Sequence, residues 1–234
     1  MYKRILLKLS GEQLAGKHET GLDPEMAKWF AKEIQPIANS GVQVVIMVGG
    51  GNIVRGAQIA GHGIKRVTGD HMGMLATMIN ALALTDIFES KGIKTRSLST
   101  IFANQVAEPF VHRLANKHLE RGRVVIVGGG SGRPYVTTDT AAIILALELD
   151  CEIVIKATKV DGVYDKDPAK HKDAVRYDTV SYQQAVEDGA IMVMDKAALG
   201  LAMEQKMPMT ILNAMIEGNI ARVVAGEPVG TKVS

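Results

Sequence analysis

One stretch of the sequence decides the fold: Val42-Gln-Val-Val-Ile-Met-Val48, followed directly by Gly49-Gly50-Gly51. A nearly continuous apolar run of this length is typical of a strand that helices cover on both faces, as in a parallel sheet. The same arrangement recurs at Arg123 to Val127, which runs into Gly128-Gly129-Gly130. In both places the glycines come where the predicted strand ends.

Strand and helix patterns alternate along the whole chain, which predicts an α/β sandwich. Three further short runs predict strands, at Tyr2 to Leu9, Glu152 to Ile155 and Met209 to Leu212. Helical spacing predicts helices at Asp23 to Ser40, Arg66 to Lys91, Glu108 to Arg121, Thr138 to Leu149, Ser181 to Asp188, Asp195 to Gln205 and Glu217 to Ala225. Pro36 is expected to kink or shorten the first of these helices, and Thr137 or Thr138 to cap the fourth. Because no repeat or linker divides the chain, we expect a single domain over residues 1–234.

Composition excludes several classes of protein. The 234 residues carry 27 Lys and Arg against 25 Asp and Glu, a net charge of +2. With no long basic run, neither nucleic-acid nor membrane-surface binding is favoured. The N-terminal residues lack the pattern of a signal peptide, and no uninterrupted apolar run reaches the length of a membrane span, so we expect a cytoplasmic protein. The single cysteine, Cys151, excludes an internal disulfide and is expected to be buried.

Three glycine-rich segments follow predicted strands and favour a phosphate site. They are Lys8-Leu9-Ser10-Gly11, Gly49-Gly50-Gly51-Asn52 and Gly128-Gly129-Gly130-Ser131-Gly132. In an open parallel sheet, ligands bind outside the carboxyl ends of the strands. Glycines let backbone N–H groups approach an anion closely, although any one of these segments alone could be a plain turn.

Other motifs of nucleotide and catalytic sites are not matched. Gly11 to Lys17 fits the first part of a phosphate-binding P-loop, but His18 stands where that motif needs a hydroxyl group to hold Mg²⁺. The dinucleotide motif fails because Val54 and Arg133 replace its last glycine. The histidines have no metal-ligand spacing, so no protein metal site is expected, and serine- and cysteine-hydrolase motifs are absent.

Three polar residues near the glycines suit phosphoryl transfer. Lys8 interrupts an apolar strand, and a lysine there could stabilise a transferring phosphoryl group, or simply extend from an exposed sheet edge. Arg55 follows the triple glycine and could bind phosphate through two N–H groups. Asp70, near the start of a long predicted helix, could accept hydrogen bonds from sugar hydroxyls.

Together these motifs resemble the bacterial uridylate (UMP) kinases of the amino acid kinase superfamily. The matching segments follow the family's order: Lys8-Leu-Ser-Gly-Glu, Gly49-Gly-Gly-Asn-Ile-Val-Arg-Gly, Gly69-Asp-His-Met-Gly-Met-Leu-Ala-Thr, Thr137-Thr-Asp-Thr-Ala-Ala, Lys156-Ala-Thr-Lys-Val-Asp-Gly-Val-Tyr, Asp167-Pro-Ala-Lys and Met194-Asp195. The resemblance implies a three-layer αβα sandwich around a mainly parallel, roughly eight-stranded sheet. It also implies transfer of the γ-phosphoryl group of ATP to UMP, with Mg²⁺, in pyrimidine nucleotide biosynthesis.

The resemblance also assigns residues to the two substrates. It places at the ATP site Lys8, Leu9, Ser10, Gly11, Gly51, Arg55, Thr158, Tyr164 and Asp167. It places at the UMP site Gly50, Asp70, Ser131, Gly132, Arg133, Pro134, Tyr135, Val136, Thr137 and Thr138. It gives catalytic roles near the transferring phosphoryl group to Lys8, Asp139 and Asp195.

The acceptor loop, Ser131-Gly-Arg133-Pro-Tyr-Val136, departs at residues 131, 133 and 136 from the family's pattern of Thr-Gly-Asn-Pro followed by two aromatic residues. The family has Asn between the glycine and proline of this loop, whereas this chain has Arg133. The family further implies a hexamer, and the apolar pattern of the Arg66 to Lys91 helix would suit an interface. The family also implies regulation by GTP as activator and UTP as inhibitor, and Gly16 to Gly21 matches the loop linked to activation. Two alternatives stay open: a carbamate or acylglutamate type kinase of the same fold, and a nucleotide-binding protein that has lost catalysis.

Overall fold

The computed structural model of the chain describes residues 1–55, 63–189, 191 and 193–234. Nine strands of these residues form one sheet in the spatial order β4-β3-β5-β2-β1-β6-β10-β11-β9. The strands are β1 (Arg4–Leu9), β2 (Gln43–Val48), β3 (Thr95–Ser99), β4 (Glu108–Pro109), β5 (Val124–Gly128), β6 (Ile153–Thr158), β9 (Thr179–Val180), β10 (Met209–Asn213) and β11 (Thr231–Val233). All neighbouring pairs are parallel except β10 with β11.

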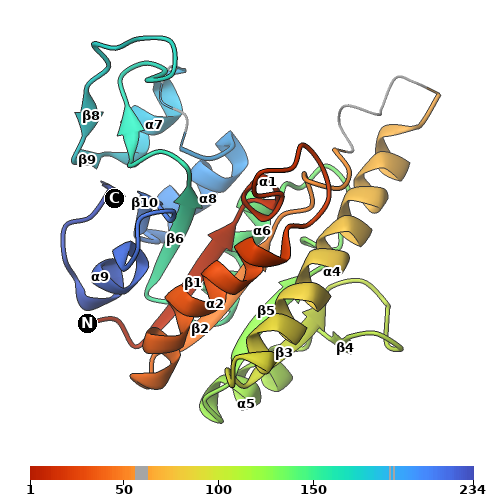
Figure 1. Cartoon of the computed structure of the whole chain (residues 1–234). Helices are drawn as coiled ribbons and strands as arrows, with labels where there is room; N and C mark the ends of the chain where they lie inside the picture. The colour runs from red at the N-terminus through yellow and green to blue at the C-terminus, as the bar shows by residue number, and fades with distance from the viewer. Residues whose placement is uncertain (56–62, 190, 192) are drawn as a thin grey trace.

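Helices cover both faces of the sheet (Figure 1). One face carries α2 (Pro24–Asn39), α4 (Arg66–Ser90) and α9 (Asn219–Ala225). The other carries α5 (His112–Glu120), α6 (Thr138–Glu148), α7 (Tyr182–Glu187) and α8 (Lys196–Gln205). Two smaller elements lie near one end of the sandwich, the single turn α1 (Gly11–Leu14) and the hairpin of β7 (Val163–Tyr164) and β8 (Arg176–Tyr177).

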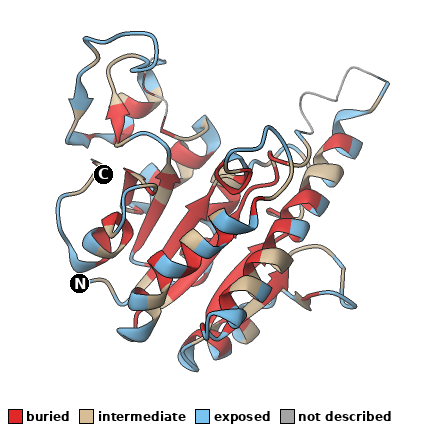
Figure 2. Cartoon of the chain, viewed as in Figure 1, coloured by how far each residue is buried: buried red, intermediate tan, exposed pale blue. Residues whose placement is uncertain are grey.

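The central strand β1 belongs to both cores because its side chains alternate between the faces. Leu7 and Leu9 pack with α2, while Leu6 packs with the helices of the opposite face. Figure 2 shows β1 and its neighbours buried between the two helix layers. By the same alternation Lys8 projects to the side of Leu6, the side that α6 covers. A lysine is thus directed into the interior, since Lys8 is only 7% exposed.

The predicted αβα sandwich with a mainly parallel sheet is confirmed, and the main sheet has nine strands where about eight were expected. The predicted helix from Glu108 to Arg121 is wrong at its start. Glu108 and Pro109 form edge strand β4, and the helix begins only at His112, because a proline lacks the N–H that a helix interior needs. Pro36 does not shorten α2, since it falls in the last turn.

Strand β3 was not predicted because its sequence, Thr-Arg-Ser-Leu-Ser, has no apolar run. Its small polar side chains are nevertheless buried, with Thr95 at 0% and Ser99 at 3% exposure. The Thr95 hydroxyl donates to Ile93 O at 2.8 Å, and the Ser99 hydroxyl donates to Ile101 O at 2.6 Å. Local hydrogen bonds of this kind let short polar side chains occupy a buried strand.

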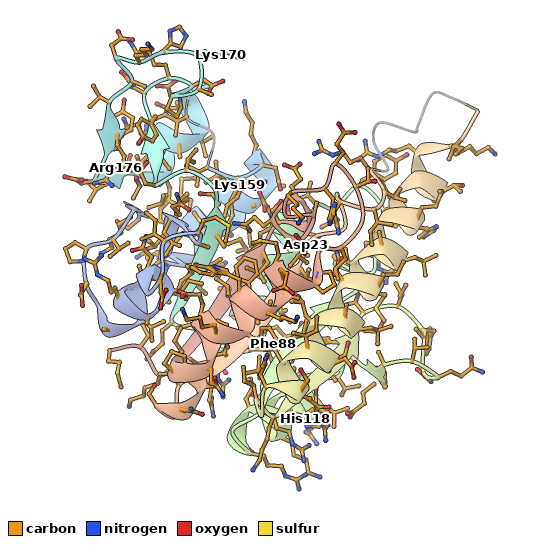
Figure 3. All side chains as sticks on the ribbon, in the orientation of Figure 1. Asp23, Phe88, His118, Lys159, Lys170 and Arg176 are labelled. Carbon is orange, nitrogen blue, oxygen red and sulfur yellow. The ribbon has the colours of Figure 1, made fainter. Side chains whose placement is uncertain are left out.

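Of the described helices, α4 is long and apolar enough, by length and composition alone, to cross a membrane. The expectation that no segment would qualify is corrected on that criterion. In the structure, 44% of the most apolar 18-residue window of α4 is buried inside the protein. Leu84 and Phe88 lie at 0% exposure in the core that α4 shares with α2 and the sheet. Figure 3 labels Phe88.

The glycines after β2 are required by close packing. A Cβ atom added to Gly50 would lie 2.8 Å from both Ala76 Cβ and Gly73 O of α4. A Cβ added to Gly49 would lie 2.9 Å from Gly11 N. These contacts hold the end of β2 against both α4 and the start of α1. The loop that follows β1 and the loop that follows β2 therefore lie side by side.

We predict that Gly50→Ala lowers the free energy of unfolding by about 1–3 kcal/mol, because its methyl group meets backbone atoms of α4 that cannot rotate away. Gly200→Ala is the matched control. Gly200 lies inside α8 with open space around it, so its replacement should raise the unfolding free energy by up to about 1 kcal/mol. Urea denaturation measures both, and an unchanged midpoint for Gly50→Ala would contradict the packing argument.

Candidate active site

A buried ion triad lies where the central strands end. Lys8 of β1 and Lys156 of β6 are directly paired in the parallel register of the two strands. Asp139, in the first turn of α6, bridges them: its Oδ1 lies 2.6 Å from Lys8 Nζ and its Oδ2 accepts from Lys156 Nζ at 2.8 Å. Lys156 Nζ also donates to Val193 O at 2.6 Å. Two ammonium groups and one carboxylate give the triad a net charge of +1.

The pKa values of the triad follow from burial and from these contacts. Burial opposes the charged form of Asp139, but the charges of Lys8 and Lys156 outweigh it and hold the pKa of Asp139 below its ordinary value of 3.8. Burial lowers the pKa of Lys156 from 10.5, and the Lys8 charge lowers it further, against the attraction of Asp139. The carboxylate is therefore ionised at neutral pH, while the lowered pKa makes Lys156 easier to neutralise than an ordinary lysine.

A cavity of about 280 Å³ lies beside the triad. It joins three of the predicted ATP residues, Lys8, Ser10 and Thr158, with residues of α1 and of the end of β6. A neighbouring cavity of about 500 Å³ is lined by Gly51 and Arg55, and both cavities share Glu12 and Lys159 as walls. Figure 3 places Lys159 at the end of β6, between the sheet and the β7–β8 hairpin. The Arg55 guanidinium forms an ion pair with the Glu12 carboxylate.

A smaller cavity, of about 150 Å³, gathers most of the predicted UMP residues. It is lined by Gly50, Gly51, Val54, Asp70, Gly73, Met74, Thr77, Gly130, Ser131, Val136, Thr137 and Thr138. Gly51 is a wall of both this cavity and the larger one, so the two spaces adjoin. Gly132, Arg133, Pro134 and Tyr135 do not line this cavity.

The last glycine of each triplet differs from the two before it. A Cβ on Gly128 or Gly129 would lie 2.7 Å from Met78 Sδ or 2.4 Å from Thr100 Oγ1 respectively. By contrast, a Cβ on Gly51 or Gly130 would meet no atom closer than 3.9 Å. The first two glycines of each triplet are therefore required by close packing. The third has open space around it and lines a cavity with its backbone.

Asp70 connects helix α4 to the acceptor loop. Its carboxylate accepts from Tyr135 N at 2.9 Å and from Arg66 Nε at 2.9 Å. Arg66 in turn lies over the Tyr135 ring, with Cζ 5.4 Å from the ring centroid. Tyr135 has a positive φ of 65° and is 68% exposed, so it forms the outer edge of the loop. Arg133 is exposed as well.

The Asp195 carboxylate accepts hydrogen bonds from groups of the protein itself. As the N-cap of α8 it accepts from Ala197 N and Ala198 N, each at 3.0 Å. It also accepts from the hydroxyls of Thr137 and Thr140 at the start of α6. The carboxylate thus joins the N-terminal ends of α6 and α8, beside Asp139 in a cavity of about 400 Å³.

Several predicted ATP residues are placed differently from Lys8. The Leu9 side chain is buried in the core, so only its backbone can face a ligand. A Cβ on Gly11 would lie 2.7 Å from Gly51 N, so Gly11 allows the two loops to touch. Tyr164 and Asp167 belong to the β7–β8 hairpin and line none of the cavities described above. There, the Tyr164 hydroxyl donates to Asp161, and Asp167 accepts from Ala169 N at 3.0 Å.

Sequence reasoning missed the role of Lys156 and a buried amide pair. Lys156 interrupts an apolar run just as Lys8 does, and this signal could have identified it. Asn80, at 0% exposure, donates to Gly49 O at 2.7 Å and exchanges hydrogen bonds with Asn52. The Asn52 side chain also donates to Gly21 O at 2.7 Å. No local pattern in the sequence marks this network, because its members are far apart along the chain.

Comparisons with known proteins agree with this geometry. A sequence profile of the amino acid kinase family matches residues 3–213. The uridylate kinase of Xanthomonas euvesicatoria pv. vesicatoria is 50% identical over 232 residues, which cover 99% of this chain and 96% of that protein. The crystal structure of UMP kinase from Bacillus anthracis superimposes with a TM-score of 0.95 at 39% identity, covering 100% of this chain and 96% of that one. The uridylate kinase of Archaeoglobus fulgidus gives a TM-score of 0.77 at 30% identity, with full coverage of both chains.

An α/β sandwich with cationic and glycine-lined cavities at its strand ends defines a phosphoryl-transferring class of protein. With the matches above, the chain belongs to the amino acid kinase family, among its uridylate kinases.

We predict that Asp139→Asn lowers the free energy of unfolding at neutral pH by about 3 kcal/mol, because two buried ammonium groups lose their shared partner. Since the pKa of Asp139 is lowered, its contribution is present above pH 3.8 and is lost as pH falls through the lowered pKa. Wild-type stability should therefore fall more on acidification than that of the variant. Urea denaturation between pH 7 and about pH 3 measures this.

The double variant Asp139→Asn/Lys156→Met is the control. Removing one ammonium group should recover part of the lost stability, which a double-mutant cycle detects as coupling. Strictly additive effects would show that Asp139 does not hold the two lysines together.

Proposed function

We propose that this protein transfers the γ-phosphoryl group of ATP to UMP, giving ADP and UDP. The observation that carries the proposal is the Lys8–Asp139–Lys156 triad, whose two lysines line the cavity of about 280 Å³. The larger cavities hold residues expected to bind ATP, and the small one holds residues expected to bind UMP. Kinases of this chemistry work mainly by positioning and by neutralising charge, which suits a buried site with excess positive charge.

In this mechanism a phosphate oxygen of UMP attacks the γ-phosphorus of ATP in line with the bond to ADP. The new P–O bond forms as the bond to the β-phosphate oxygen breaks, and ADP leaves with that electron pair. Because the acceptor oxygen is already anionic, no strong general base is required. Lys8 stabilises charge on the transferring group, and Asp139 holds the Lys8 ammonium in place. The bare backbones of Gly51 and Gly130 give both phosphates room to approach.

Mg²⁺ is proposed to enter with ATP and to neutralise part of its phosphate charge when bound. Among the described residues, no three His, Cys, Asp or Glu side chains gather in a way that could hold a metal ion. Of the carboxylates near the proposed phosphate site, Asp139 is already bound by two lysines and Glu12 forms an ion pair with Arg55. We therefore expect phosphate oxygens and water to supply most of the metal's ligands.

The same proposal covers assembly, regulation and location: one domain, working as a hexamer in the cytoplasm. Leu75 and Ile79 of α4 are 55% and 52% exposed, which supports an apolar interface between copies. GTP is the proposed activator and UTP the proposed inhibitor. For activation, Gly16 to Gly21 is a suitable segment, because Gly21 N donates to Asn52 O at 2.8 Å, next to Gly51. A ligand that moves this loop would act on the glycines of the site.

A coupled assay of ADP release, run with UMP, CMP, carbamate and an acylglutamate, tests the proposed function. UMP should be the preferred acceptor. Preference for carbamate or an acylglutamate would select the alternative kinase. No acceptor-dependent ADP release with any of them, from a protein that still binds ATP, would indicate a nucleotide-binding protein.

We predict that Lys8→Ala lowers kcat by about 10² or more, because one fixed positive charge is lost from the transition state. The fold should survive, since Lys156 still pairs with Asp139. Lys28→Ala, which removes an exposed lysine on α2, is the control and should keep wild-type turnover. A folded Lys8→Ala variant with near-normal kcat would disprove the assigned role.

We predict that Asp70→Ala raises the KM for UMP about tenfold or more, with a smaller effect on the KM for ATP. The physical reason is the loss of a carboxylate that accepts from ribose hydroxyls. Asp86→Ala, an exposed change farther along α4, should leave both KM values unchanged. If the wild-type protein used UMP and 2′-deoxy-UMP equally well, the ribose contact would be refuted.

A further inference from the structure

Gln13 is a buried polar residue that none of the assignments above uses. It lies in the single turn α1 and is 2% exposed. Its Oε1 accepts from Ser10 N at 3.2 Å, while the Ser10 hydroxyl accepts from a backbone N–H of α1. This reciprocal arrangement is a capping box, and it explains why the Gln13 side chain turns back toward the end of β1.

The capping box also fixes which atom of the Gln13 amide faces elsewhere. Ser10 N is a donor and can only be satisfied by an acceptor, so the oxygen of the amide must point to it. The other atom, Nε2, is then a donor that has no hydrogen-bond partner within the part of the chain that the structure describes. A buried donor without a partner is costly, and proteins rarely keep one unless something else binds there.

The space beside Gln13 has the chemistry of a polyanion site. Gln13 lines the cavity of about 280 Å³ together with Lys8, Lys156 and Lys159. Glu12 is the single acidic residue among those walls, so positive charge dominates. Gln13 is not a wall of the smaller cavity that gathers the predicted UMP residues. We therefore assign the unpaired N–H group of Nε2 to the phosphates of ATP.

We infer that Gln13 binds the nucleotide that gives up the phosphoryl group. Its Nε2 donates a hydrogen bond to a phosphoryl oxygen of the bound nucleoside triphosphate. The inference rests on the proposed function for the identity of the nucleotide. The ammonium groups of Lys8 and Lys156 attract phosphate from any direction, whereas the amide of Gln13 is pinned at its oxygen and offers an N–H in one direction. Gln13 thus orients the phosphate chain that the lysines attract.

Gln13→Glu tests this contact without removing the cap. Glutamate keeps an acceptor for Ser10 N, so thermal stability should stay close to that of the wild type. The donor is lost and a carboxylate replaces it, so the KM for ATP should rise about tenfold or more while the KM for UMP changes less than about twofold. Gln35→Glu, at a partly exposed position of α2, adds the same charge elsewhere and should leave both KM values unchanged.

Gln13→Met separates loss of the hydrogen bond from added charge. It removes donor and acceptor without charge, so the melting temperature should fall and the KM for ATP should still rise several-fold. Equilibrium titration with AMP and with a non-hydrolysable ATP analogue provides a readout that general loosening of α1 would not give. The analogue should bind more weakly to both variants, and AMP should bind as it does to the wild type.

The inference is overturned if both variants bind the ATP analogue as tightly as the wild type, which would mean that water satisfies Nε2. It is also overturned if only Gln13→Glu is affected, which would indicate repulsion without a lost hydrogen bond. Failure of the proposed function gives a different result. The wild-type protein would then release no ADP with UMP, while the titrations with the ATP analogue would still report on Gln13.

Discussion

Two like charges forced together inside the sheet are the constraint on which the rest of the site depends. Lys8 and Lys156 are register partners on adjacent parallel strands, and neither can reach bulk water easily. A single carboxylate, Asp139, holds both. A buried charge is tolerated only when it is paired, and here one carboxylate is shared by two ammonium groups, which leaves one positive charge in excess. In the proposed function an anionic ligand supplies the missing negative charge, so phosphate binding would follow from the electrostatics of the fold.

The topology explains why the carboxylate arrives at the right place. The chain passes from β5 through α6 to β6, crossing β2 and β1 on the face opposite α2 and α4. This crossover begins α6 next to the end of β1, and the Thr137 cap fixes its first turn so that Asp139 lies over the two lysines. Asp195 then ties the start of α8 to the same turn. Ligands of open parallel sheets bind at such a point, outside the carboxyl ends of strands whose connections run in opposite directions along the sheet.

The glycines show how packing and binding share one short sequence. Within each triplet two members have no room for a side chain, and the third opens onto a cavity. In the first triplet Gly49 lets the loops after β1 and β2 come into contact, and the amide pair of Asn52 and Asn80 is hydrogen-bonded to Gly49 O at that contact. The open members can then present backbone to phosphate from a closely packed support. The glycine backbone can thus approach a ligand closely because the loops that carry it pack closely against the rest of the protein.

The sequence by itself determined the layered α/β architecture, the strands with long apolar runs, and the loops that end them, because hydrophobic periodicity and glycine position are local signals. Lys8 and Asp70 stood out locally for the same reason. Strand β3 and the two-residue edge strands could not be foreseen, since Thr95 and Ser99 are buried only through neighbours distant in sequence. Tertiary structure alone decided that Lys156 faces Lys8, that Asp139 bridges them, that Arg133 is exposed, and that Gln13 keeps a free donor. Each of these is a relation between residues that only strand register and helix placement bring together.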